Sequence, residues 1–141
     1  MKVNHIERAF DNAWKAKERK GWDHIYVLVD VHGVMYEPDY TKPSEKVYPD
    51  CLEPLKIMSE DNRFKLIMWT CSRAEDIKKY REQLGKFGIK FDWVNKNPEV
   101  QHLEALGDYR NKLYANVILD DKAGFDPEDW VIINNWLSRM V

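Results

Sequence analysis

The sequence lacks any long apolar run. No stretch reaches the roughly 18 apolar residues of a membrane-spanning helix, and the first ten residues, MKVNHIERAF, lack the apolar core of a secretory signal peptide. We therefore expect a cytoplasmic protein with no membrane partner.

Cysteine is scarce. The two cysteines, Cys51 and Cys71, are twenty residues apart and belong to no CxxC motif and no Cys/His ligand spacing. This spacing predicts two reduced thiols and argues against a disulfide framework or a zinc site.

Neither sign of charge is in large excess. The 141 residues include 22 Lys and Arg against 24 Asp and Glu, a net charge of -2, which argues against nucleic acid as a partner. A chain that is 44% hydrophobic and 33% charged is typical of a soluble globular protein. The length suits a single domain, residues 1–141, with a real core.

Along the chain, segments with a helical pattern alternate with segments with a strand pattern. Helices are predicted over residues 3–20, 50–60, 72–87 and 126–140, and strands over 24–29, 64–70, 89–95 and 115–121. Residues 34–49 are predicted as a long loop with a short hairpin, and 96–113 as a mixed segment with a helical turn near 100–106. Asn4 and Ser72 are the predicted N-terminal caps of their helices, Ser72 forming a capping box with Glu75.

Each predicted strand is an unbroken apolar run, which is typical of a parallel sheet covered on both faces. Alternation of such strands with helices predicts an α/β fold. We expect a three-layer sandwich in which a small parallel sheet is flanked by helices.

Three of the predicted strands end on polar side chains. Asp30 ends the first, Thr70 the second, and Asp120 and Asp121 the fourth. Because ligands of parallel α/β sheets bind beyond the carboxyl ends of the strands, we expect these side chains to converge. A lysine, either Lys96 or Lys112, is expected nearby.

This group of residues suits phosphoryl transfer. Converging carboxylates with oxygen ligands only are typical of a Mg²⁺ site, and a lysine beside a hydroxyl suits phosphoryl oxygens. Asp30 can attack phosphorus and form an acyl phosphate. His32 is close enough to protonate the leaving group and then to activate water. The expected substrate is a phosphorylated small molecule or another phosphate ester.

These segments resemble the haloacid dehalogenase (HAD) superfamily. VLVDVHGV is similar to its first motif, an apolar strand followed by D-x-D-G-T/V, LIMWTCSR to its second, and ANVILDD to its fourth. KLYANVILDDKAGFDPEDW, preceded by VNKNPE, is similar to the small members that lack a cap domain. The resemblance implies a Rossmann-like fold without a large cap and a Mg²⁺-dependent phosphatase.

The resemblance also implies a metal site. Asp30 would be both the nucleophile and a Mg²⁺ ligand. The backbone carbonyl of His32 and the carboxylate of Asp121 would complete the protein ligands. Asp120 would act through water or orient its neighbour.

The remaining implied roles concern the phosphate. Thr70 would hydrogen-bond the phosphoryl oxygens, and Gly33 would allow the backbone to approach them. Lys112 would neutralise charge, with Lys96 as the reserve candidate. Arg73 is a further candidate for binding an anionic part of the substrate.

His32 departs from the family pattern, because the phosphatase members carry a general-acid aspartate there. An unperturbed imidazole has a pKa of about 6.5 and can donate and accept protons near neutral pH. We therefore expect an active hydrolase with an altered leaving-group or pH preference. The alternative is a non-catalytic HAD-like binding or regulatory module, against which the retained Asp30 and Thr70 argue. A phospho-acceptor receiver domain is set aside because it carries such residues in another order.

Overall fold

The computed structural model describes residues 4–141 except 101–102, 105–106 and 110. The parallel sheet has the strand order β3-β2-β1-β6 and is accompanied by a β4-β5 hairpin. Its strands are β1 (Ile25–Asp30), β2 (Phe64–Trp69), β3 (Trp93–Val94) and β6 (Val117–Leu119), and those of the hairpin are β4 (Leu103–Glu104) and β5 (Gly107–Asp108). The helices are α1 (His5–Lys20), α2 (Leu52–Glu60), α3 (Ala74–Gly85) and α4 (Asp129–Met140), with 3-10 turns η1 (Pro49–Cys51) and η2 (Asp121–Ala123).

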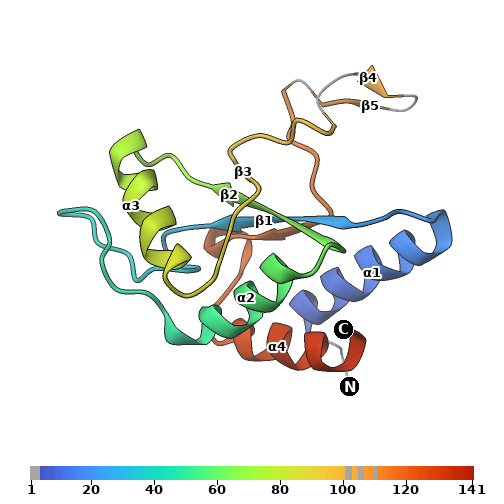
Figure 1. The fold of residues 1–141 in the computed structure, drawn as a ribbon, viewed down its shortest axis with the longest axis horizontal. Helices are drawn as coiled ribbons and strands as arrows, with labels where there is room; N and C mark the ends of the chain where they lie inside the picture. Colours follow the sequence, from blue (N-terminus) through green and yellow to red (C-terminus); the bar gives the residue numbers. More distant parts are fainter. Residues whose placement is uncertain (1–3, 101–102, 105–106, 110) are drawn as a thin grey trace.

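The two faces of the sheet are covered by different parts of the chain (Figure 1). Helices α1, α2 and α4 lie together on one face, where Phe10, Leu55 and Trp136 join the main core. On the other face Leu28 packs in a smaller cluster with Tyr114 and neighbouring residues of the segment that leads to β6. The predicted α/β fold, a small parallel sheet flanked by helices without a large cap, is confirmed.

The strand order explains why the second face is covered by described residues of the connection between β3 and β6, such as Val100 and Tyr114. The chain runs from β1 to β2 to β3 across the sheet and then returns to add β6 on the other side of β1. Because parallel crossovers are right-handed, a return in the opposite direction lies on the opposite face from α2. The reversal occurs beside β1, and ligand crevices form at such a switch point.

The register brings the predicted polar strand ends to one level. Asp30 pairs with Trp69, the residue before Thr70. Val29 pairs with Leu119, which puts Asp30 level with Asp120. Three residues far apart in the sequence therefore meet at one edge of the sheet.

One of the two predicted helix caps is wrong. Asn4 caps α1 as expected, its Oδ1 accepting from Ile6 N–H at 2.8 Å. Helix α3 instead begins at Ala74 with no side-chain cap. The hydroxyl of Ser72 is engaged elsewhere, 3.1 Å from His32 Nε2 and 2.8 Å from Thr70 Oγ1, so it does not cap the helix.

Other local predictions have mixed outcomes. The short hairpin in 34–49 is confirmed by the pairing of Tyr36 with Val47. The strand predicted over 89–95 is too long, since β3 covers Trp93–Val94. The helical turn predicted near 100–106 is wrong at residues 103–104, which form β4 of the hairpin, and residues 101–102 and 105–106 lie outside the described residues. Among the described residues, no helix is long and apolar enough to cross a membrane.

Candidate functional site

Three carboxylates converge beyond β1 and β6. One oxygen each from Asp30, Asp120 and Asp121 lies within 4.8 Å of the others. Asp30 ends β1, and its Oδ1 accepts from Val31 N–H at 2.8 Å. Asp120 begins the turn after β6, and its Oδ1 accepts from Lys122 N–H at 2.9 Å. Such a set of oxygen donors could hold a hard cation.

Gly33 makes room for this cluster. Its backbone has φ +81, a conformation that residues with a side chain rarely adopt, and an added Cβ would lie 2.6 Å from Asp121 Oδ2. Backbone hydrogen bonds fix the turn, with Gly33 N–H donating to Tyr36 O at 2.8 Å. Because Gly33 has no side chain, the Asp121 carboxylate can approach its backbone closely. The predicted approach of the Gly33 backbone to a phosphate stays a prediction.

The carboxylates hold more negative charge than their surroundings balance. Burial raises the pKa of Asp30 from 3.8 to about 7, with a hydrogen bond to Asp121 and the charges of Asp120 and Asp121 acting in the same direction. The N–H of Val31 opposes this rise but does not cancel it. Without a cation, Asp30 is therefore protonated in a large fraction of the molecules at neutral pH.

We expect Asp30→Asn to stabilise the cation-free protein near pH 8. In the unfolded chain Asp30 titrates at its ordinary pKa near 4, so folding favours its protonated form, and stability falls as the pH rises from about 4 to about 7. The side chain is only partly buried, so the gain is discounted to on the order of 1–2 kcal/mol. Thermal unfolding in EDTA should show a higher Tm near pH 8, a clearly smaller gain near pH 5 and little change near pH 4.

Exposed Asp23, at the other end of β1, provides the control for this prediction. Asp23→Asn should leave the Tm unchanged at all three pH values. A gain for Asp30→Asn that is equal at all three pH values would contradict the assigned cause.

A cavity of about 570 Å³ opens beside the carboxylates. It is lined by residues from the carboxyl ends of all four strands of the sheet: Asp30, Trp69, Thr70, Cys71, Asn95, Asp120 and Lys122. Asp30, Thr70 and Asp120, predicted from three separate strand ends, are therefore brought together at one cavity. The exposed indole of Trp69 adds an apolar wall beside Cys71, and the other lining residues are polar or charged.

Asn95 holds Thr70 in place. Its Oδ1 accepts from Thr70 N–H at 2.8 Å, and its Nδ2 donates to Thr70 O at 2.7 Å. Asn95 itself has φ 56, a left-handed conformation that asparagine tolerates better than most residues. The sequence pattern did not single out Asn95, although the strand predicted over 89–95 ends on it.

Replacement of Asn95 by alanine should lower the free energy of unfolding by about 1–3 kcal/mol, because Thr70 loses two partners and alanine is strained at positive φ. Asn95→Gly removes the same bonds without the strain and should cost less. Urea unfolding of both variants separates the two causes. If neither variant were destabilised, the described role of Asn95 would be wrong.

His32 lies between two serine hydroxyls. Its Nδ1 is 2.8 Å from Ser44 Oγ, and its Nε2 is 3.1 Å from Ser72 Oγ. Ser72 Oγ is in turn 2.8 Å from Oγ1 of Thr70, which lines the cavity. A chain of hydroxyls thus connects the imidazole to the cavity. Buried Ser44 also ties the 37–48 loop to this part of the molecule.

The lysine that lines the cavity is Lys122, which the sequence pattern did not single out. Lys96 and Lys112 are exposed, as is Arg73, and none of these three is among the described residues of the cavity lining. The sequence feature that could have indicated Lys122 is its position directly after the acidic pair. In the structure it lies in a turn that ends at Gly124, whose φ is 96.

Comparison with known proteins bears on the fold. No protein-family model and no curated protein matches the chain. The structure is similar to that of a conserved protein from Bacteroides thetaiotaomicron, with a TM-score of 0.63 and 26% sequence identity. The match covers 84% of this chain and 93% of that chain. This similarity supports the fold over most of the chain and does not bear on activity.

Proposed function

We propose that this protein is a Mg²⁺-dependent phosphomonoester hydrolase that acts through an aspartyl phosphate on Asp30. The observation that carries the proposal is the convergence of three carboxylates with Thr70 and Lys122 beside one cavity. The same residues are the ones that the HAD resemblance implies, except that Lys122 takes the place expected of Lys112. The substrate class is a phosphate ester.

The donor set fits Mg²⁺. Asp30, Asp120 and Asp121 would hold the ion with oxygen atoms, its preferred ligands, and the resemblance adds the backbone carbonyl of His32. Burial is the main cause of the raised pKa of Asp30, and the charges of Asp120 and Asp121 add to it; a cation would offset those two charges. When bound, Mg²⁺ would supply positive charge that stabilises the phosphoryl oxygens.

The chemistry proceeds in two displacements at phosphorus. In the first, an Asp30 oxygen bonds to phosphorus while the bond to the substrate's alcohol oxygen breaks and that oxygen takes a proton. In the second, a water oxygen bonds to phosphorus and loses a proton, the bond to Asp30 breaks, and inorganic phosphate leaves. Thr70 and Lys122, which both line the cavity, would hydrogen-bond the phosphoryl oxygens and stabilise the developing charge.

We assign the proton transfers to His32, which reaches the cavity through the hydroxyls of Ser72 and Thr70. His32→Ala should lower turnover by about 10²-fold. Ser72→Ala should also lower turnover, because this substitution interrupts the chain of hydroxyls between His32 and the cavity. If His32→Ala matched wild type while His32→Asp raised activity, the histidine would not be a catalyst.

A second candidate function is a non-catalytic binding module. One observation favours it: both imidazole nitrogens of His32 already contact serine hydroxyls. Hydrolysis of 4-nitrophenyl phosphate, measured with Mg²⁺ and with EDTA, separates the two functions. The hydrolase predicts phosphate release that requires Mg²⁺. Binding of Mg²⁺ and phosphate without release, across a panel of phosphate esters, would favour the binding module.

A further inference from the structure

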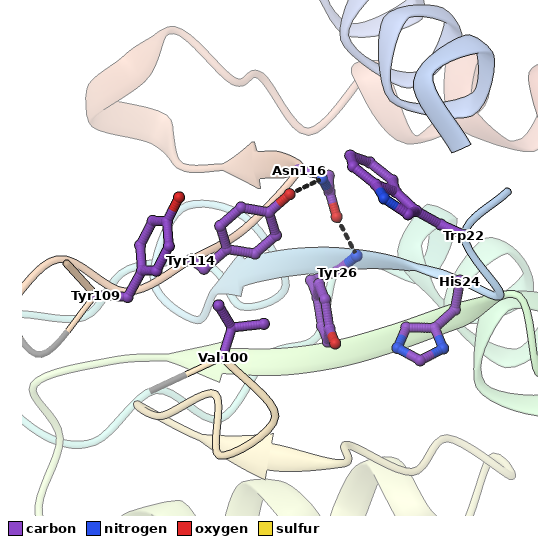
Figure 2. A pocket seen from close by; sticks show the side chains of 7 residues that line it. All are labelled: Trp22, His24, Tyr26, Val100, Tyr109, Tyr114 and Asn116. Carbon is purple, nitrogen blue, oxygen red and sulfur yellow. Dashed lines mark hydrogen bonds between the residues drawn. The ribbon is translucent and has the colours of Figure 1, made fainter. Parts of the chain in front are cut away.

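A second cavity, of about 380 Å³, has none of the three carboxylates among its lining residues, which are shown in Figure 2. Five aromatic rings line it, those of Trp22, His24, Tyr26, Tyr109 and Tyr114. Tyr26 precedes Asp30 by four residues on β1, about 13 Å at the usual rise of about 3.3 Å per residue. The described linings of the two cavities have no residue in common.

The walls of this aromatic cavity are held by hydrogen bonds. Asn116 Oδ1 accepts from Tyr26 N–H at 2.8 Å, and Asn116 Nδ2 donates to Tyr114 OH at 3.1 Å (Figure 2). On the other side, Glu99 Oε1 accepts from Tyr26 OH at 2.9 Å and lies 3.0 Å from His24 Nε2. A cavity whose walls are already ordered binds a ligand at a smaller entropic cost.

The rings are oriented so that they present faces in different directions. The planes of Tyr26 and Tyr114 meet at 85°, and those of Tyr109 and Tyr114 at 81°. Aromatic faces and edges of this kind stack on, or pack against, planar rings. The volume falls within the range of small-molecule sites, which are concave, mostly aromatic or apolar, and carry few polar groups.

The chemistry of the lining favours a neutral ligand. No Lys, Arg, Asp or Glu is among the described residues that line this cavity. The Glu99 carboxylate, which accepts from Tyr26 OH and lies 3.0 Å from His24 Nε2, is already engaged by these wall residues. The ammonium of Lys20 lies 5.2 Å from the Trp22 ring centroid and disfavours a second cation on that wall. The Asn116 amide retains one donor and one acceptor position beyond its two hydrogen bonds, which suits a polar ring edge.

We propose that the aromatic cavity binds a planar, uncharged heteroaromatic ring with a hydrogen-bonding edge, as presented by the base of a free nucleoside. Trp22 and Tyr109 each offer the base a ring to pack against, at opposite ends of the lining (Figure 2), and Asn116 contacts its edge. This site is independent of the proposed phosphatase chemistry, because no carboxylate of that chemistry lines it.

The test is binding of adenosine, guanosine, cytidine and uridine to the full chain, measured by saturation-transfer NMR and calorimetry. At least one nucleoside should bind, and Trp22→Ala and Tyr109→Ala should each weaken binding roughly tenfold. Neither residue belongs to the described core clusters, so the fold should survive both changes. Tyr40→Ala, at a residue 95% exposed, and Asp30→Asn should both bind as wild type does.

Several outcomes would overturn the proposal. Binding of none of the four nucleosides would do so, as would binding that both wall variants leave unchanged. Loss of binding in Asp30→Asn would move the ligand to the carboxylate cavity. Tighter binding of choline than of any nucleoside would show that the aromatic cavity selects a cation instead.

Discussion

Asp30→Asn is expected to reduce Mg²⁺-dependent hydrolysis of an aryl phosphate by about 10³-fold or more. The amide keeps the shape of the carboxylate but does not attack phosphorus, so no aspartyl phosphate forms. The kcat for 4-nitrophenyl phosphate at saturating Mg²⁺ measures the loss. Because the same change relieves repulsion with Asp120 and Asp121, it should leave the protein folded, and the lost activity can be assigned to chemistry.

Two comparisons make the Asp30 result specific. Asp23→Asn should retain full activity, since Asp23 is exposed at the opposite end of β1. Asp120→Asn should mainly raise the Mg²⁺ concentration needed for activity, because it removes one proposed oxygen ligand and leaves the nucleophile. An Asp30→Asn protein that retained turnover within about tenfold of wild type would exclude Asp30 as the nucleophile.

Gly33→Ala is expected to abolish turnover and to lower the free energy of unfolding by roughly 2 kcal/mol or more. Alanine is strained at φ +81, and its Cβ would lie 2.6 Å from Asp121 Oδ2, so the Asp121 carboxylate must move out of the cluster. Hydrolysis and thermal unfolding, each with and without Mg²⁺, measure both effects.

Gly21 provides a matched control for Gly33. It also has a positive φ, +69, but a Cβ there would meet nothing within 4 Å. Gly21→Ala should therefore carry the backbone strain alone, with turnover preserved. If Gly33→Ala behaved like Gly21→Ala and kept its activity, the contact between Gly33 and Asp121 would be irrelevant to function.

The main features of the fold and of the carboxylate site could be predicted from the sequence, because both depend on one pattern. Apolar runs that are buried on both faces mark the strands, and the polar residues that follow them mark the carboxyl edge of the sheet. Parallel register then places Asp30 beside Asp120 on one side. On the other side Asp30 pairs with Trp69, the residue that precedes Thr70. No knowledge of side-chain contacts is needed for that inference.

The parts that could not be predicted depend on local turns and on tertiary contacts. Lys122 reaches the cavity because Asp120 and Gly124 close a tight turn, which the apolar pattern does not encode. Ser72 fits a capping box by its spacing, yet contacts with His32 and Thr70 override that local preference. Similarly, Ile89 and Phe91 look like strand residues but are buried in the core before β3 begins.

The central claim is that a covalent phosphoryl group forms on Asp30, and rapid quenching tests it most directly. Wild-type protein is mixed with a ³²P-labelled phosphate ester and Mg²⁺, quenched in acid, digested and mapped. We predict label on the peptide that contains Asp30, released by hydroxylamine and absent without Mg²⁺ or in Asp30→Asn. Turnover without any labelled peptide, or label on a residue other than Asp30, would contradict the proposed mechanism.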